Sequence, residues 1–282
     1  MNYFYSHLNI CFFLYFVILL LGNIDSQPNR DDDEEKNVFS KIARTTKTDK
    51  ITQHKYDLLY DEFFSPAQIR RTKKILEIGL GCDMNYGPGA SATIWPRLFP
   101  KAKVYFVEYN GTCVEKYRTQ LDSLNVTILV GDQADSKFLL GVATEHGPFD
   151  VIIDDGGHSD RQMLNSLRVL AGKALSPGGI YFIEDLICNL LNSDPYLDYS
   201  EDQSTADWGY HPLKNKFQHG NVQQRSIVGA PTSVIQMFVA ELAADEYAGS
   251  TWANNHFKYV GCGRGICFFR SYTTEERQRL SQ

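Results

Sequence analysis

The sequence predicts an α/β protein in which a mostly parallel β-sheet is covered by helices on both faces. Short apolar runs bounded by glycine alternate with longer segments of helical periodicity, which is the order that parallel strands and their connecting helices require. The strand candidates are apolar throughout, so both faces of the sheet are expected to be buried. An acidic residue follows or ends each of five strand candidates, which marks one edge of the sheet as polar.

Length and composition exclude some classes of protein. The chain has 282 residues, of which 43% are hydrophobic and 22% are charged, so it holds enough apolar material for one good-sized core. The formal net charge is -6 and there is no dense basic patch. A nucleic-acid partner is therefore not expected. The sequence carries no signal of oligomeric state.

The N-terminal segment is typical of entry into the secretory pathway. Residues 8–21 are apolar apart from Asn9, and acidic, unpatterned sequence follows them. A run of this kind resembles the core of a signal peptide, although no Lys or Arg precedes it; extended back to Tyr3 it could just span a bilayer. A buried core helix is the alternative. We expect residues 1–26 to be a signal peptide or signal anchor, and the protein to be secreted, lumenal or anchored in a membrane by a single pass.

The elements can be assigned in order along the chain. Residues 27–50 are polar and are expected to form a flexible stem, and residues 51–282 one domain. A helical pattern begins near Ile51 and is expected to end at Pro66. Strands are expected over 74–80, 103–109, 125–132, 149–154 and 178–185, and helices over 90–99, 113–124, 135–146 and 159–174.

The end of the chain departs from this alternation. Residues 186–230 have little periodicity and are expected to form a lid over an acceptor; the candidate wall residues are Trp208, Tyr210, His211 and Phe217. A helix over 233–247 and two strands within 256–270 follow. Cys262 and Cys267 flank the turn between these strands and could pair in an oxidising lumen or serve as small apolar residues. With Cys11 in the signal, an odd five cysteines remain, which indicates neither a disulfide framework nor a zinc site.

One group of residues at the strand ends points to an adenosine-containing cofactor. Gly79 and Gly81, after Glu77, allow a tight turn and close approach of the backbone to a ligand. Glu108 ends the second strand, where a carboxylate can bind both hydroxyls of a ribose. Asp132 and Gln133 follow the third strand and could contact adenine.

A second group points to a cation. Asp154 and Asp155, with Glu184 and Asp185, end two strands that should be neighbours. Carboxylates that converge must take up a proton or hold a cation, and oxygen ligands suit Mg²⁺. His158 follows two glycines at a helix start and could act as a general base. Alternatively, His158 caps the helix, and the carboxylates cap helices and bind water.

These motifs resemble a known family. KILEIGLG, VYFVEY, LVGDQAD, FDVIIDDGGH and PGGIYFIEDL resemble class I S-adenosylmethionine-dependent methyltransferases, and more narrowly the metal-dependent O-methyltransferases of macrolide-sugar and cephamycin biosynthesis. GLGCDMNYGPGAS with DDGGH also resembles fungal proteins described as hard-surface-induced. The resemblance covers about residues 51 to 270. It implies a doubly wound, Rossmann-like, seven-stranded and mostly parallel sheet with an antiparallel C-terminal strand.

The resemblance also implies roles for single residues. By resemblance to the macrolide group, Asp155, Glu184 and Asp185 would bind Mg²⁺, and His158 would act as the base. The methionine end of the cofactor would lie along Glu77, Gly79 and Gly81. Its ribose would bind Glu108, and its adenine would lie near Asp132 and Gln133. The sequence departs from the family at Asp83, where a third glycine is usual, and after Asp185, where the continuation differs.

Three functions from different classes remain open at this point. The first is transfer of a methyl group from S-adenosylmethionine, with Mg²⁺, to a hydroxyl of a sugar or small polyhydroxylated acceptor. The second is an NAD-dependent oxidoreductase, which would need the missing third glycine. The third is a non-catalytic secreted interaction protein that keeps the fold. The set of acids argues against the third, because carboxylates that repel one another need a reason to stay together.

Overall fold

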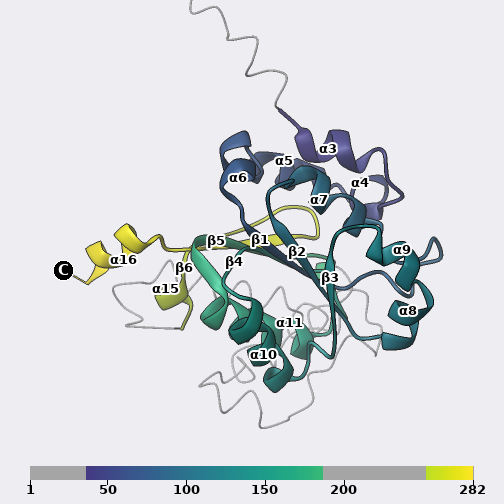
Figure 1. Cartoon of the computed structure of the whole chain (residues 1–282). Coiled ribbons are helices and arrows are strands. Elements are labelled where there is room, and N and C mark those ends of the chain that lie inside the picture. Colours follow the sequence, from purple (N-terminus) through teal and green to yellow (C-terminus); the bar gives the residue numbers. More distant parts are fainter. Residues whose placement is uncertain (1–35, 187–251, 282) are drawn as a thin grey trace, which may run out of the picture. The chain divides into compact units, whose positions relative to one another are not determined.

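A computed structural model describes residues 36–186 and 252–281 (Figure 1). The expected signal segment, nearly all of the expected lid, and the helix expected over 233–247 lie outside the described residues. The described residues from Asn37 onward belong to one compact unit. All structural statements below concern its described part.

The centre of this unit is a sheet of seven strands in the order β3-β2-β1-β4-β5-β7-β6. β1 pairs in parallel with both β2 and β4. The strand order therefore changes direction at β1, with β2 and β3 on one side of it and β4 and β5 on the other. β7 runs antiparallel to β5 and to β6. This confirms the predicted sheet, including its antiparallel C-terminal strand. The strands are β1 Lys74–Ile78, β2 Lys103–Glu108, β3 Thr127–Val130, β4 Phe149–Asp154, β5 Leu175–Ile183, β6 Phe257–Cys262 and β7 Cys267–Ser271.

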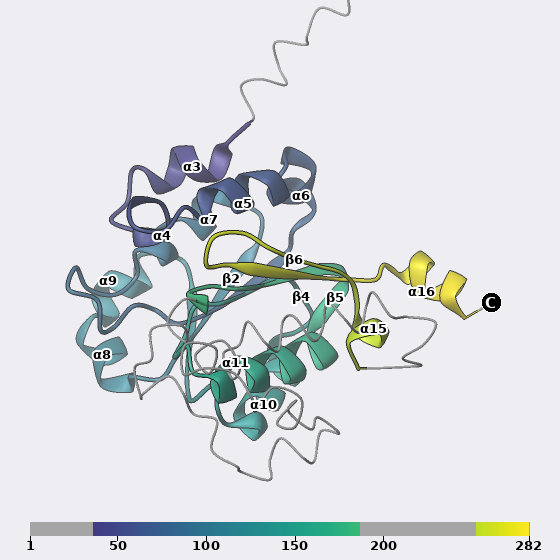
Figure 2. The ribbon, with the colours of Figure 1, turned by 180° about the vertical axis from the view of Figure 1, so that it is seen from behind.

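Helices cover both faces of the sheet, as the apolar strands predict (Figures 1 and 2). The helical segments are α3 Val38–Ala43, α4 Asp49–Thr52, α5 Asp57–Phe63, α6 Pro66–Arg71, η1 Ser91–Thr93, α7 Trp95–Leu98, α8 Gly111–Lys116, α9 Arg118–Asp122, α10 Ser136–His146, α11 Asp160–Ser166, η2 Leu167–Ala171, α15 Trp252–His256 and α16 Thr274–Leu280. α3, α5, α6 and α7 lie over one face, and α10 and α11 over the other.

Alternation along each strand divides the core into two clusters. In β1, Ile75 joins the cluster under α3, α5 and α7, whereas Leu76 joins the cluster under α10 and α11. Both side chains are fully buried. Because successive side chains of a strand point to opposite faces, two adjacent acids at a strand end point in different directions.

The folded unit begins earlier than residue 51, where the sequence pattern suggested that the domain starts. Phe39 in α3 is fully buried and packs against Tyr60 and Trp95, with ring centroids 4.7 Å and 5.6 Å away. Lys50 in α4 is buried as well. These two helices were not predicted, because they are short, carry little apolar periodicity and lie in polar sequence.

Two other expectations need correction at helix boundaries. Pro66 does not end a helix but begins α6, where Ser65 accepts a hydrogen bond from the backbone N–H of Gln68. Proline is tolerated at this first position because its missing N–H would have no partner there. The helix expected over 159–174 divides into α11 and the π-helical turn η2.

Candidate active site

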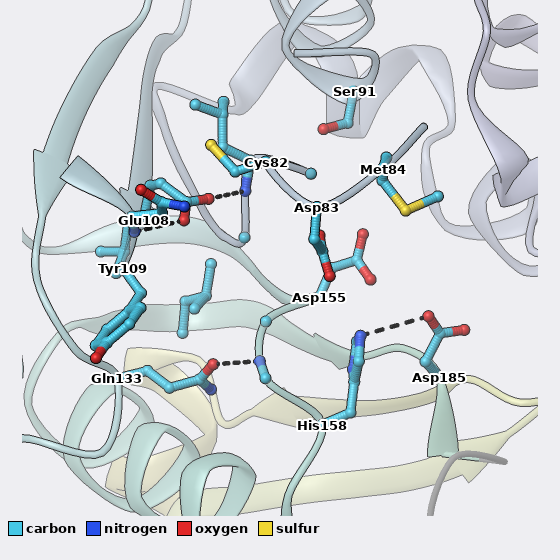
Figure 3. A pocket seen from close by; sticks show the side chains of 18 of the residues that line it. Cys82, Asp83, Met84, Ser91, Glu108, Tyr109, Gln133, Asp155, His158 and Asp185 are labelled. Carbon is cyan, nitrogen blue, oxygen red and sulfur yellow. Dashed lines mark hydrogen bonds and ion pairs between the residues drawn. The ribbon is translucent and has the colours of Figure 1, made fainter. Parts of the chain in front are cut away.

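A cavity of about 380 Å³ opens at the carboxyl ends of the central strands. This is the edge where the sequence placed its acids, and ligands of open α/β sheets bind there. The volume lies within the range of about 300 to 1,000 Å³ that is usual for small-molecule and cofactor sites. Figure 3 shows Glu108 and Tyr109 on one side of the cavity, and Asp155, His158 and Asp185 on the other. We call these the cofactor side and the acid side.

The loop after β1 can take its path only with glycine at its first bend. Gly79 has a φ of +96°, and a Cβ there would lie 2.0 Å from the carbonyl oxygen of Asp155. Gly81 has a φ of +76°. Both values favour glycine over any other residue. The loop therefore packs directly against the end of β4 and lines the cavity, as does Asp83 in the place of the usual third glycine.

Glu108 is held by the backbone of the loops around it. Its Oε2 accepts a hydrogen bond from the N–H of Leu80 at 3.0 Å, and its Oε1 accepts one from the N–H of Asn110 at 2.7 Å. An ionised carboxylate has about four acceptor positions, so a ligand can still donate to Glu108. Tyr109, which the sequence did not single out, also lines the cavity and is 75% exposed.

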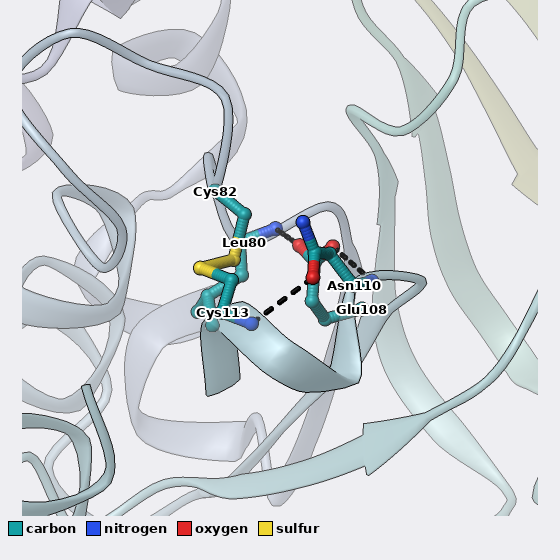
Figure 4. The surroundings of a disulfide bond; sticks show 5 residues. All are labelled: Leu80, Cys82, Glu108, Asn110 and Cys113. Carbon is teal, nitrogen blue, oxygen red and sulfur yellow. Dashed lines mark hydrogen bonds between the residues drawn. A yellow bond between two sulfur atoms is a disulfide. The ribbon is translucent and has the colours of Figure 1, made fainter. Parts of the chain in front are cut away.

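A disulfide tethers the two loops of the cofactor side. Cys82, in the loop after β1, is bonded to Cys113 in α8, 31 residues further along the chain (Figure 4). Asn110 caps the same helix by accepting from the N–H of Cys113 at 3.0 Å. The cysteine count indicated no disulfide framework, so this pair is a correction. The pair was hidden because the two cysteines belong to different motifs and meet only when β1 and β2 pair.

The adenine candidates lie at the edge of the cofactor side. Asp132 lines the cavity, and its Oδ1 accepts from the N–H of Ala134 at 2.8 Å. Gln133 lines it too, but its amide is already engaged: it donates to Asp154 and Ser166 at 3.0 Å and accepts from the N–H of Gly157 at 2.7 Å. The structure thus gives the Gln133 side chain a role in holding the β4 end, which the expectation of an adenine contact did not foresee.

The acid side brings Asp155, His158 and Asp185 together. One ligand atom of each lies within 4.8 Å of the others. The Nε2 of His158 is 3.5 Å from Oδ2 of Asp185 (Figure 3). His158 does not cap the following helix, because Ser159 forms that cap together with Gln162. The alternative role for His158 is therefore excluded.

Two of these residues have strained backbones. His158 has a φ of +57° and Asp185 a φ of +54°. The left-handed region is uncommon for residues other than glycine, and a strained backbone persists only where the surrounding structure enforces it. Such outliers concentrate at functional sites. The fold therefore holds these two side chains in place against a local conformational cost.

Glu184 and Glu77 do not line the cavity but contact a buried lysine. The Nζ of Lys50 lies 2.5 Å from Oε2 of Glu184 and 3.2 Å from Oε1 of Glu77. It is also 2.6 Å from Oδ2 of Asp155. Tyr60 donates its hydroxyl to Glu184, and Trp95 donates Nε1–H to Glu77 at 2.6 Å. These contacts occupy two residues predicted to face ligands: Glu184 as a metal ligand and Glu77 at the methionine end of the cofactor.

Lys50 is the residue that sequence reasoning missed most clearly. Burial lowers the pKa of a lysine, but here the carboxylates of Asp155, Glu184 and Glu77 outweigh burial and hold the pKa of Lys50 well above its usual value. One ammonium cannot neutralise all three carboxylates. Burial accordingly raises the pKa of Glu184 well above its usual value, against the attraction of Lys50. Converging carboxylates were expected either to hold a cation or to take up a proton. Here they do both in part, because Lys50 is the cation and Glu184 has a raised pKa.

Asp185 also receives support from the N-terminal helices. Tyr56 donates its hydroxyl to Oδ1 of Asp185 at 2.6 Å and accepts from the Asp185 N–H at 3.1 Å. Burial, and then the charge of Asp185, raise the pKa of Tyr56. The Nδ1 of His54 is 3.6 Å from the same carboxylate. Tyr56 falls within the helical pattern that begins near Ile51, and that pattern did not indicate a role at the site.

The residues present fit a divalent cation and an adenosine cofactor with one exception. Asp155 and Asp185 supply the oxygens that Mg²⁺ prefers, and His158 stands beside them. Among the described residues, Nδ1 of His158 is buried without a hydrogen-bond partner. Glu184, predicted as a third ligand, does not line the cavity and is paired with Lys50 and Tyr60 instead, so its role as a metal ligand stays a prediction. The glycine loop and Glu108 fit the cofactor.

Comparisons with known proteins find relatives whose names describe the methylation of sugar hydroxyls. No protein-family model matches the chain. Over 135 residues it is 36% identical to the 8-demethyl-8-(2-methoxy-alpha-L-rhamnosyl)-tetracenomycin-C 3'-O-methyltransferase of Streptomyces olivaceus, which covers 47% of this chain and 32% of that protein. Over 129 residues it is 33% identical to the mycinamicin VI 2''-O-methyltransferase of Micromonospora griseorubida, covering 45% and 30%. The chain spans about a third of the length of these relatives.

Solved structures agree on the fold. The MycE methyltransferase from the mycinamycin biosynthetic pathway, in complex with Mg and SAH, superposes with a TM-score of 0.64 at 20% identity, over 86% of this chain and 56% of that one. Its complex with Mg, SAH and mycinamycin VI gives a TM-score of 0.63 at 22% identity, over 88% and 60%. The chain has the fold of the class I S-adenosylmethionine-dependent methyltransferases. The resemblance to macrolide-sugar O-methyltransferases is confirmed, and that to the hard-surface-induced proteins stays a prediction.

Proposed function

We propose that the protein is an S-adenosylmethionine-dependent O-methyltransferase that acts on a hydroxyl of a sugar or small polyhydroxylated acceptor. One observation carries this proposal: a single cavity joins the glycine loop and Glu108 to the cluster of Asp155, His158 and Asp185. The first group suits the cofactor, and the second suits activation of a hydroxyl. The relatives whose names describe methylation of sugar hydroxyls support the acceptor class.

The cofactor side offers a place for each part of S-adenosylmethionine. The backbone at Gly79 and Gly81 would follow the methionine end, and Glu108 would accept from the ribose hydroxyls. Asp132 stands near the expected adenine position. The exposed ring of Tyr109 offers a flat apolar face against which an adenine could stack.

The acid side offers the groups that a hydroxyl needs in order to react. Asp155 and Asp185 would hold Mg²⁺, and that ion would supply a lowered pKa for an acceptor hydroxyl in contact with it. His158 lines the cavity and would take the hydroxyl proton at Nε2, where the nearby Asp185 carboxylate stabilises the resulting imidazolium. The acceptor oxygen would then bond to the methyl carbon as the carbon–sulfur bond breaks and its electron pair stays on sulfur. Close positioning of the two reactants supplies much of the rate.

The test of this proposal uses the full chain. Titration calorimetry with S-adenosylmethionine and with S-adenosylhomocysteine, each with Mg²⁺ and with EDTA, should show binding of both compounds in both buffers. Mass spectrometry after incubation with a panel of rhamnosides and other glycosides should then show a methylated product. If neither compound binds under either condition, the proposal is rejected.

One observation favours a second candidate, a non-catalytic interaction protein that keeps the fold. The carboxylates of this site do not merely repel one another, because Lys50 lies between them. Their presence together is therefore a weaker argument for catalysis than the sequence suggested. Binding of S-adenosylhomocysteine without turnover on any acceptor of the panel would favour this candidate.

We also propose that the protein works in an oxidising compartment of the secretory pathway. The Cys82–Cys113 and Cys262–Cys267 disulfides support this, since such bonds persist mainly outside the cytosol. Within the described ranges, no helix has the length and apolar character needed to cross a bilayer. Blocking free thiols in protein taken from secreting cells, followed by peptide mass mapping, should recover both pairs. Recovery of four free thiols would contradict the proposal.

A further inference from the structure

The acid side contains a cation of its own. The Nζ of Lys50 lies 2.5 Å from Glu184, 2.6 Å from Asp155 and 3.2 Å from Glu77, and the lysine side chain is only 2% exposed. A lysine this deeply buried has lost its hydration, so the carboxylates must replace the water that it lost. It therefore binds these three acids and does not merely pass near them.

Asp155 belongs to two clusters at once. Its Oδ2 pairs with Lys50, and Asp155 is also one of the three residues, with His158 and Asp185, whose ligand atoms lie within 4.8 Å of one another. A divalent cation bound in that second cluster would lie close to the ammonium of Lys50. Two cations that share one carboxylate repel each other and compete for its oxygens.

We infer that Lys50 is a resident counter-ion that takes the place of part of a metal site and lowers the affinity of the Asp155–His158–Asp185 cluster for divalent cations. The inference concerns the cation site of the proposed function and rests on it to that extent. It explains why Glu184 pairs with Lys50 and does not line the cavity: the lysine, and not the metal, is its partner. The metal would then bind through fewer protein ligands and leave more positions open to an acceptor.

A purely structural role for Lys50 makes the opposite prediction. If the lysine served to position Asp155 for the metal, its removal would let that carboxylate move and would weaken metal binding. If it competes, its removal leaves Asp155, Glu184 and Glu77 with no buried cation, and metal binding becomes tighter. The direction of the change in affinity separates the two roles.

The experiment measures Mn²⁺ binding to the EDTA-treated full chain by the electron paramagnetic resonance signal of free Mn²⁺. The variant Lys50→Met keeps a long apolar stem and removes the charge. We expect its dissociation constant for Mn²⁺ to fall by about tenfold, the effect of roughly one screened unit charge nearby. The control is Lys55→Met, which removes an exposed lysine that donates to the Ile51 carbonyl and should leave the affinity unchanged.

A second variant protects the test against misfolding. Lys50→Met with Glu184→Gln removes one charge of each sign, so the buried cluster keeps its net charge while Asp155 still loses its lysine partner. We expect this double variant to bind Mn²⁺ more tightly than the wild type, though less tightly than Lys50→Met. An affinity at or below that of the wild type in whichever variants fold, or no Mn²⁺ binding in any of them, would overturn the inference.

A parallel titration of the same samples with S-adenosylhomocysteine keeps this result separate from the proposed function. Cofactor binding together with unchanged Mn²⁺ affinity in the variants rejects only the role of Lys50. If the wild type does not bind S-adenosylhomocysteine, the proposed function is rejected, whatever the Mn²⁺ affinities of the variants are.

Discussion

The cofactor side and the acid side of the cavity satisfy their carboxylates in different ways. Glu108 accepts from backbone N–H groups of Asn110 and Leu80, which are 2 and 28 residues away along the chain. On the acid side, Lys50 reaches Asp155 and Glu184 over 105 and 134 residues. The first arrangement is built from loops that adjoin paired strands, whereas the second is completed only when the N-terminal helices dock on the sheet.

The backbone differs between the two sides as well. On the cofactor side, the left-handed residues are the glycines at 79 and 81, which adopt that conformation without strain. On the acid side they are His158 and Asp185, which do not. If the proposed function is right, we expect cofactor binding and turnover to depend on different sides of the cavity. Damage to the cofactor side should reduce affinity, and damage to the acid side should reduce turnover.

The largest effect is expected from His158→Ala. Loss of a general base should lower kcat by about 10² to 10⁴-fold, while the affinity for S-adenosylhomocysteine stays near that of the wild type, because no cofactor contact is removed. Stopped assays on an acceptor from the panel, together with calorimetry, measure both. Unchanged turnover would remove the base assignment, and an equal loss of cofactor affinity would mean that the two sides are not separable.

Gly79→Ala should show the opposite pattern. The new Cβ would lie 2.0 Å from the carbonyl of Asp155, so the loop has to move away from the end of β4. We expect a loss of about 100-fold or more in affinity for S-adenosylhomocysteine, equivalent to nearly 3 kcal/mol.

Gly141→Ala in α10 is the matched control, because nothing lies within 4 Å of its added Cβ. It should leave cofactor affinity unchanged and raise the free energy of unfolding by up to about 1 kcal/mol. A Gly79→Ala protein that binds the cofactor as well as this control would refute the packing argument.

Glu108→Gln should weaken the cofactor by about tenfold or somewhat more. An amide offers one acceptor oxygen, so it cannot accept from both Leu80 and Asn110 and still serve a ribose; hydrogen bonds to a charged group are worth about 1.5 to 3 kcal/mol. Calorimetry with S-adenosylhomocysteine measures the change. Asp132→Asn, with a single backbone contact, should cost less. If Asp132→Asn loses more affinity for S-adenosylhomocysteine than Glu108→Gln, then Asp132 and not Glu108 makes the stronger contact with the cofactor.

Loss of a disulfide is expected to have the smallest effect on cofactor affinity, although its effect on stability is large. Cys82 and Cys113 close a loop with a sequence separation of 31, and Cys262 and Cys267 one with a separation of 5. In the chain-entropy model, replacing each pair by serines should lower the free energy of unfolding by about 3.7 and about 2 kcal/mol respectively. Only loss of the first pair should also reduce cofactor affinity, by a few-fold. Denaturant titrations give the stabilities, and equal cofactor affinity in both variants would show that the tether does not shape the loop.

The sequence predicts those features of the site that depend on residues close together along the chain. The alternation of strands and helices predicted the sheet, because apolar periodicity reports which faces are buried. Glu108 and Gly79 line the cavity, since a residue at the carboxyl end of a parallel strand lies at that edge whatever the rest of the chain does; their contact with a cofactor stays a prediction. His158, Asp155 and Asp185 come together for the same reason.

Only the tertiary structure decided which member of each acidic pair faces the cavity. Asp154 is buried and bonded to Gln133, Ser166 and Tyr181, and Glu184 is turned to Lys50, so Asp155 and Asp185 remain at the site. These partners depend on how α4, α5 and α11 pack on the sheet. No local pattern marks a lysine in a polar stretch as the buried counter-ion of acids more than 100 residues away. Sequence determined the edge and its acids; long-range packing determined what neutralises them.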